Sequence, residues 1–343
     1  MRLGRSALVV GAIVVVAAAC VPPPAPPAPA PYLDQVFTNV VVTPKGTGIP
    51  FGAAPPVDPT VGSANDTHAR QVDAAGNEII HLWMADPTDN PDQKRPAIIW
   101  VHGGGFVGGI GAEYGLANGT GAAYAKRGYV GFSIEYRIDT TSQCQYVQDH
   151  QHEVPLPPNF DALRAQCVRG ITAAVQDSQA AVRWVRRHAA AYRIDPNKVA
   201  IGGFSAGAVT ADMVAFNSDL AGSWKYSADD DPAASSRVQA AFGASGCNYD
   251  PSTIGVGDSP TSFIHSEFDR AVDYRDCVVP TFTAARGAGL VAELTSYCGQ
   301  TGHAAALYQQ HLATTDAQWT TFLARELRIY SKLRPASADP LCP

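Results

Sequence analysis

Five consecutive residues, 203–207, read Gly-Phe-Ser-Ala-Gly and place a serine between two glycines. An apolar segment precedes them and a run of small residues follows, which fits a strand, a sharp turn and a helix. Such a turn exposes the serine hydroxyl, and the glycines keep side chains out of the crowded turn. The pattern therefore predicts Ser205 as a nucleophile. The alternative is a glycine-rich turn in which the serine is a bystander.

A second glycine-rich motif, His-Gly-Gly-Gly-Phe at 102–106, directly follows a short apolar run at 96–101. Attack on a carbonyl creates an oxyanion, which needs N–H donors that are already in position. Glycines let the backbone approach the substrate closely. We predict that the N–H groups of Gly104, Gly105 and Ala206 form this oxyanion hole. A phosphate-binding loop is the alternative, but no Lys-Ser/Thr pair follows and the GxGxxG spacing is absent.

A serine nucleophile needs a base, and in this arrangement the base and its acid follow the serine along the chain. His303 lies in a loop after the last predicted strand and is the expected base, whereas His311 falls in a predicted helix. Asp269 follows the predicted strand 261–265 and is the expected acid. Three nearby carboxylates are alternatives for that role: Glu267, Asp273 and Asp276.

These motifs resemble a known family. The glycine loop, the Tyr136-Arg137 pair, the helix that carries Asp177 and the pentapeptide around Ser205 are together similar to the hormone-sensitive-lipase-like and type-B carboxylesterase branch of the α/β hydrolases. The resemblance covers roughly residues 35–333. It implies hydrolysis of small carboxylic esters through an acyl-serine, without a metal or cofactor.

Other functions are compatible with the same motifs. A lipase for longer acyl chains would need a lid, and a peptidase would need an accessory domain that selects peptides. A binding protein on an inactive hydrolase scaffold would need a broken triad. The formal net charge is −6 and no basic block stands out. We therefore expect no nucleic-acid partner.

The elements that would position these residues alternate between strands and helices. This alternation is typical of βαβ units around a mostly parallel sheet, so we expect an α/β-hydrolase fold in one domain, residues 33–335, followed by a short tail, residues 336–343. The expected strands are 35–43, 78–85, 96–101, 129–136, 199–203, 238–245, 261–265 and 291–297, and the expected helices are 117–127, 171–192, 208–216, 277–287 and 315–333.

The start of the chain has the pattern of an export signal. Two arginines precede an apolar run, 7–19, that is short for a permanent membrane span. We expect a signal peptide over residues 1–19. The small residues before Cys20 resemble a bacterial lipobox, which implies lipidation of Cys20 and attachment to the outer face of the cell membrane. Ordinary cleavage would instead give a secreted protein. The prolines of 20–32 predict an extended tether.

Six cysteines follow Cys20, and an even number in an exported chain favours disulfides. Cys144 and Cys167 lie near the two ends of the segment 137–170. Its prolines and weak periodicity predict a long loop without packed secondary structure, at the sheet edge where substrates bind. We predict that these two cysteines pair and fix the loop as a wall of the active-site entrance. The pairing of the others stays open: Cys247, Cys277, Cys298 and Cys342.

Overall fold

The structure is a computed structural model that describes residues 29–61, 71–109, 111–218, 234–330, 333 and 341–342. The predicted signal peptide, Cys20 and most of the predicted tether lie outside the described residues. Within them, no helix is both long and apolar enough to cross a bilayer.

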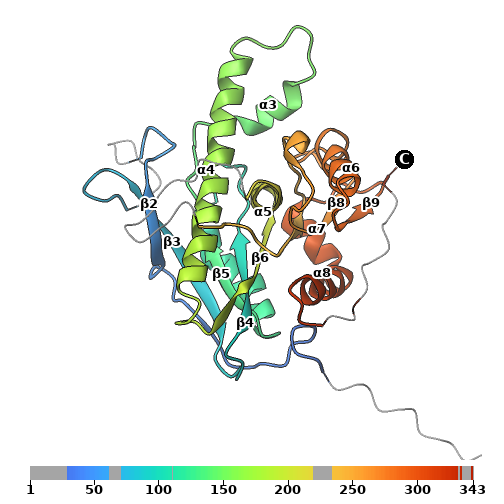
Figure 1. Cartoon of the computed structure of the whole chain (residues 1–343). Coiled ribbons are helices and arrows are strands. Elements are labelled where there is room, and N and C mark those ends of the chain that lie inside the picture. Colours follow the sequence, from blue (N-terminus) through green and yellow to red (C-terminus); the bar gives the residue numbers. More distant parts are fainter. Residues whose placement is uncertain are drawn as a thin grey trace, which may run out of the picture.

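One mixed sheet forms the centre of the molecule (Figure 1). Its nine described strands lie in the order β1-β3-β5-β4-β6-β7-β8-β9, with β2 beside β3. Pairings of β3 with β1, β2 and β5 are antiparallel, and all other pairings are parallel. The α/β fold predicted from the alternation of elements is therefore present. The strands are β1 (Val40–Val42), β2 (Ile49–Ala54), β3 (Glu78–Pro87), β4 (Arg95–Val101), β5 (Val130–Ile134), β6 (Ile194–Phe204), β7 (Ala240–Ala244), β8 (Thr261–Ser266) and β9 (Ala292–Tyr297).

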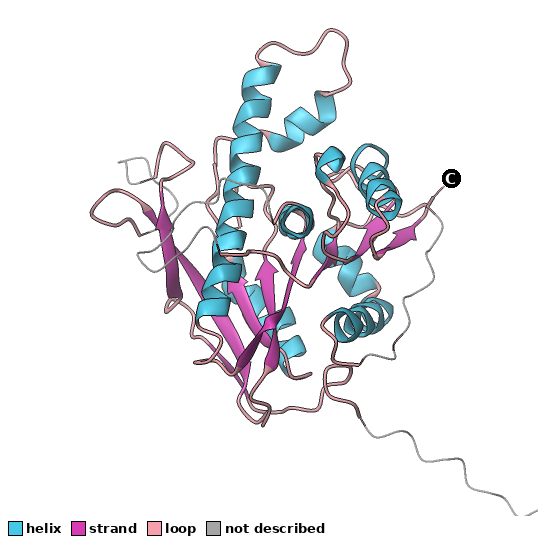
Figure 2. Ribbon diagram, in the orientation of Figure 1, coloured by secondary structure: helices cyan, strands magenta, loops and turns pink. Residues whose placement is uncertain are grey.

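Helices cover both faces of this sheet (Figure 2). All residues of β4 are buried, because successive side chains enter a core on each face. Ile99 packs on the face that α4 and α5 cover, whereas Trp100 packs against Tyr124 and Phe242 on the other. The helices are α1 (Ala112–Leu116), η1 (Ala117–Gly121), α2 (Ala122–Ala125), α3 (Cys144–His150), α4 (Phe160–Arg187), α5 (Ala206–Phe216), η2 (Pro251–Thr253), η3 (Tyr274–Val278), α6 (Val279–Gly287), α7 (Ala304–Gln310) and α8 (Leu312–Glu326).

The prediction for the segment 137–170 is wrong. It is not a loop without packed secondary structure, because it contains α3 and the first turns of α4, which begins at Phe160 rather than at Ile171. These first turns project beyond the sheet beside α3 (Figure 1) and expose most of their side chains. A helix exposed on most sides has no apolar stripe, so the hydrophobic periodicity that marks its later turns is missing here.

Several further elements were not predicted, among them one strand and one helix near the site. The strand β2 lies in a segment interpreted as a Gly/Pro-rich connection, and it pairs with β3 through a register shift between Pro50 and Gly52. The short helix α7 begins directly after His303. Proline and glycine are rare inside strands, and an edge strand with a bulge is one of the few places that tolerates them.

Three disulfides join parts of the chain that surround the carboxyl end of the sheet. Cys144 pairs with Cys167, as predicted, and thereby ties α3 to α4. The pairs that the sequence left open are Cys247–Cys277 and Cys298–Cys342.

Candidate active site

Ser205 lies in a sharp turn between β6 and α5, at the N-cap of the helix. Its φ of 55° and ψ of −124° are rare for a residue with a side chain, and such backbone strain is concentrated at functional sites. The backbone N–H of Ser205 donates to the carbonyl of Ala244, which anchors the turn to β7. The serine side chain is thereby presented beyond the end of β6.

The glycines on either side of Ser205 are required by space. A Cβ atom on Gly203 would lie 2.4 Å from the carbonyl carbon of Gly207. A Cβ atom on Gly207 would lie 2.1 Å from the carbonyl oxygen of Val101. Both distances are far below van der Waals contact and involve backbone atoms, which cannot rotate away. The two glycines therefore let the turn close tightly against the end of β4.

His303 and Asp269 meet Ser205 in a continuous chain of hydrogen bonds. The Asp269 carboxylate can only accept, so Nδ1 of His303 carries the proton and donates to it, at 2.9 Å from Oδ1 and 2.8 Å from Oδ2. In a neutral imidazole this leaves Nε2 as the acceptor. The Ser205 hydroxyl donates to Nε2 over 2.8 Å. The three residues predicted from the sequence are thus brought together in the order serine, histidine, aspartate.

The surroundings of Asp269 hold it ionised. Burial alone would raise the pKa of this carboxyl, but hydrogen bonds from His303 and Ser245 and the nearby His265 outweigh burial and keep the pKa below its usual value. Ser245 Oγ donates to Oδ2 at 2.7 Å and accepts from the N–H of Ala304, next to His303. Ser245 therefore holds both the acid and the base.

The other candidate acids and base are engaged elsewhere. Glu267 accepts from the N–H of Gly299 and pairs with Arg275. Asp273 caps η3, and Asp276 contacts His152. The ring of His311 stacks on Tyr297, and its Nε2 bonds with Gln300, not with Ser205.

The glycine loop packs against the turn that carries Ser205. A Cβ atom on Gly103 would meet the carbonyl oxygen of Phe204 at 2.9 Å, and Gly104, with φ at +132°, would clash with the carbonyl of Gly108. Gly104 accepts two backbone bonds through its own carbonyl, from Val107 and Gly108. Both contacts fix the loop in a conformation that only glycine adopts freely.

A cavity of about 140 Å³ opens over Ser205. Gly105 and Ala206, two of the predicted oxyanion donors, line it together with the nucleophile. Gly104 lies one residue before this lining. Gln145 and Gln148 of α3 line the opposite side, and both donate to the carbonyl of Arg270, just after Asp269. The disulfide-bonded segment thus forms part of the wall around the serine.

Two contributors were missed by the sequence reasoning. Ser245 is 24 residues before Asp269 in the chain and follows β7, and only the pairing of β7 with its neighbours brings it to the acid. Tyr249 lines the same cavity from the next loop. Neither belongs to a motif, so no signal in a single sequence marks them.

Comparisons with known proteins agree with this architecture. The family model named BD-FAE matches residues 85–154 and 162–249, which include the glycine loop and the turn around Ser205. Fumonisin B1 esterase of Sphingopyxis macrogoltabida is 28% identical over 186 residues, 47% of this chain and 31% of that protein. Tuliposide A-converting enzyme b1 of Tulipa gesneriana is 27% identical over 150 residues, 43% of this chain and 34% of that enzyme. The chain thus spans about a third of the length of these relatives.

A solved structure, esterase Est2 of Thermogutta terrifontis, shares the fold with a TM-score of 0.55 at 20% identity, over 74% of this chain and 90% of that one. The same esterase phosphorylated by paraoxon superposes with a TM-score of 0.53 at 21% identity, over 73% and 89% of the two chains. The matched segments, the mostly parallel sheet and the shared fold lead to one conclusion: the chain has the α/β-hydrolase fold, and over residues 85–154 and 162–249 it is similar to the BD-FAE family.

Proposed function

We propose that the protein hydrolyses carboxylic esters through an acyl intermediate on Ser205. The observation that carries this proposal is the unbroken hydrogen-bond chain from the Ser205 hydroxyl through His303 to Asp269. The relatives that carry esterase or lipase names, among them secreted lipase 5 of Gibberella zeae, support the same chemistry.

In this proposal each of the three side chains has a role. His303 Nε2 takes the proton of Ser205 as Oγ attacks the ester carbonyl, and Asp269 stabilises the imidazolium that forms. His303 then gives the proton to the leaving alcohol. Water repeats the cycle on the acyl-serine and releases the acid.

The charge that develops on the carbonyl oxygen needs donors beside Ser205. We assign this role to the N–H groups of Gly104, Gly105 and Ala206. Ala206 begins α5, so its N–H is among the first four of the helix, which have no partner in the preceding turn. The positive end of the helix dipole adds to the stabilisation of a negative charge there.

Turnover of p-nitrophenyl acetate by the purified protein tests the proposal. We expect steady hydrolysis and stoichiometric loss of activity with paraoxon, whose phosphorylated serine is identified by peptide mass spectrometry. Phosphorylation of a peptide other than the one containing Ser205, or no turnover at all, would contradict the proposal.

We also propose that the protein is exported. Three disulfides favour an oxidising compartment. The signal peptide over residues 1–19, the tether over 20–32 and the single domain over 33–335 remain part of this proposal. Export has two alternative outcomes, a membrane-attached lipoprotein and a secreted protein. The first residue of the mature protein distinguishes them, because a lipoprotein would begin at an acylated Cys20.

The disulfide between Cys144 and Cys167 gives a further prediction. Replacement of both by serine should lower the free energy of unfolding by about 3 kcal/mol, because the bond closes a loop of 23 residues in the unfolded chain. Since α3 lines the cavity over Ser205, KM for bulky esters should rise more than KM for acetyl esters. Chemical denaturation and a panel of esters measure both effects. Equal KM changes for all esters would show that α3 is no part of the substrate's surroundings.

A further inference from the structure

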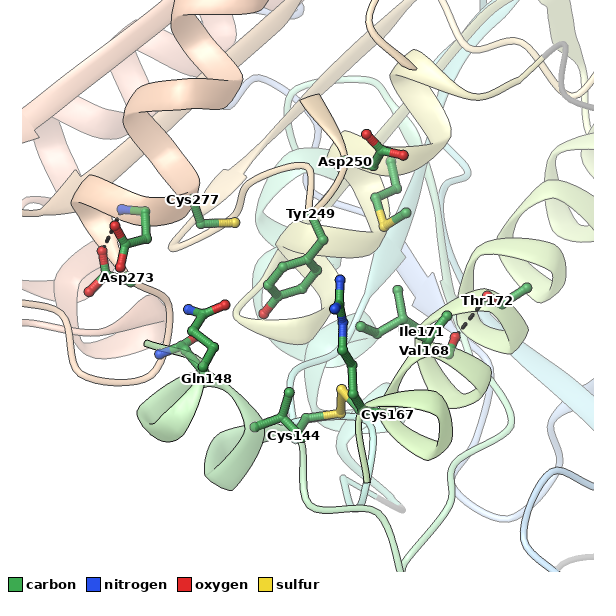
Figure 3. A pocket seen from close by; sticks show the side chains of 15 residues that line it. Cys144, Gln148, Cys167, Val168, Ile171, Thr172, Tyr249, Asp250, Asp273 and Cys277 are labelled. Carbon is green, nitrogen blue, oxygen red and sulfur yellow. Dashed lines mark hydrogen bonds between the residues drawn. A yellow bond between two sulfur atoms is a disulfide. The ribbon is translucent and has the colours of Figure 1, made fainter. Parts of the chain in front are cut away.

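A second, larger cavity adjoins the one over Ser205. Its volume is about 550 Å³. Cys144, Gln148 and Tyr249 line both cavities, so the two are neighbours that share a wall. Figure 3 shows the ring of Tyr249 pointing into this second cavity, with Gln148 on one side and Ile171 on the other. The larger space is therefore reached past Tyr249 from the nucleophile.

The helix α5 gives the direction and length of this path. Ser205, Val209 and Met213 are spaced by four residues, so they lie on one face of the helix. The first two line the small cavity, and Met213 lines the large one. Eight residues of α-helix rise about 12 Å. A substrate group that follows this face would extend about that far from the ester carbonyl.

The position of His303 indicates which half of an ester lies along α5. His303 gives its proton to the leaving oxygen, so the alcohol must lie on the histidine's side of Ser205. A separate hollow on that side is lined by Asp269, Phe268 and Thr301. Asp269 is hydrogen-bonded to His303, and Thr301 lies two residues before it in the chain. It meets the second cavity at a shared rim of α3 and η3 residues, such as Gln148 and Asp276. The alcohol belongs in that hollow, and the acyl group belongs along α5.

The walls of the second cavity define the chemistry of its occupant. Val168 and Tyr249 are 51% and 43% exposed, and together with Ile171 and Met213 they offer apolar surface to the cavity. The charged residues of the lining are Arg164 and three carboxylates, Asp250, Asp273 and Asp276. An excess of negative charge disfavours an acyl group that ends in a carboxylate.

We propose that this second cavity is an acyl-binding subsite for extended, uncharged acyl groups, and that Tyr249 controls entry to it. The inference rests on the proposed esterase function. The two residues directly before Tyr249 in the chain are held in place. Cys247 is bonded to Cys277, and the N–H of Asn248 donates to Thr281 Oγ1 at 2.9 Å. A ring on so well-anchored a loop can serve as a fixed divider between the two cavities.

Two substitutions with opposite expected effects test the subsite. The measurement is kcat/KM for p-nitrophenyl esters from acetate to decanoate, with alkyl acetates as the corresponding alcohol series. Met213→Trp fills the far end and should lower the decanoate-to-acetate ratio at least tenfold, since each lost methylene contact in such a pocket changes selectivity severalfold. Tyr249→Ala joins the two cavities and should raise the same decanoate-to-acetate ratio by a similar factor.

The control is Val256→Trp, which adds the same ring at a position that is 91% exposed and lines none of the three hollows. It should leave both ratios unchanged. Paraoxon labelling of Ser205 in each variant verifies that the fold is intact. Labelled variants with an unchanged acyl ratio, or a change confined to the alcohol series, would overturn the subsite alone. Failure of the unaltered protein to hydrolyse any ester would overturn the proposed function, and the subsite with it.

Discussion

Ser205→Ala is expected to lower kcat for a short-chain ester by roughly a million-fold, which is the effect of removing the nucleophile from a serine-histidine-aspartate triad. The loss is this large because the other groups act only through the serine. Without Oγ, His303 has no proton to take and no covalent intermediate forms. The residual rate would come from the oxyanion donors and from substrate positioning alone.

The variant should fold normally. The surrounding turn holds the backbone conformation of Ser205, and within the described part of the chain the Ser205 hydroxyl bonds to His303 alone. Ser235→Ala is the matched control, since Ser235 is exposed and lies far along the chain from the triad. Burst kinetics with p-nitrophenyl acetate and labelling with paraoxon give the comparison. Labelling that survives in the Ser205 variant would place the nucleophile at another residue.

The catalytic half of the fold could be predicted because its elements carry strong local signals. The strand β4 is a continuous apolar run that ends at a glycine loop, and α5 follows a sharp turn with obligatory glycines. The backbone has room only for glycine at these positions, so the requirement is visible in the sequence as a glycine motif. The two motifs fix the ends of neighbouring parallel strands, β4 and β6, and thereby bring the glycine loop to Ser205.

The parts that were not predicted have structure without a local apolar pattern. The first turns of α4 are rich in good helix formers such as Ala162, Leu163 and Ala165. This helix propensity was the signal in the sequence that indicated a helix here. The prolines before it and the absence of hydrophobic periodicity instead led to the prediction of a loop. The strand β2 depends on pairing with β3, which is a tertiary interaction. Propensity would have recovered α4, whereas no local feature would have recovered β2.

The site, like the fold, contains residues that a local sequence pattern predicts and residues that only tertiary contacts bring into place. Asp269 and His303 follow strand ends, and a strand order typical of this fold puts both near Ser205. The support they receive from Ser245, and the large cavity beside Tyr249, arise where three loops and α3 converge. Disulfides fix two of these segments, Cys144–Cys167 and Cys247–Cys277. A single sequence with six cysteines does not specify that arrangement.

Asp269→Asn is the second large expected effect, a loss of roughly ten-thousand-fold in kcat. The reason lies in the bonds that the side chain already makes. Oδ1 accepts from the N–H groups of Ala271 and Val272, so an asparagine would keep its oxygen there and place its NH₂ group toward Nδ1 of His303. An amide donor facing Nδ1 selects the imidazole tautomer that carries its proton on Nε2. His303 could then no longer accept the proton of Ser205.

The same substitution should change how stability depends on pH. Because the folded protein lowers the pKa of Asp269, the ionised carboxylate stabilises the fold above about pH 4, and this contribution is lost as the pH falls through the lowered pKa. The asparagine variant should lack this acid-side change in the free energy of unfolding. Asp195→Asn is the control, since Asp195 lies at the start of β6, at the other end of that strand from Ser205. A variant at Asp269 that keeps activity within tenfold would show that another carboxylate, such as Glu267, orients the base.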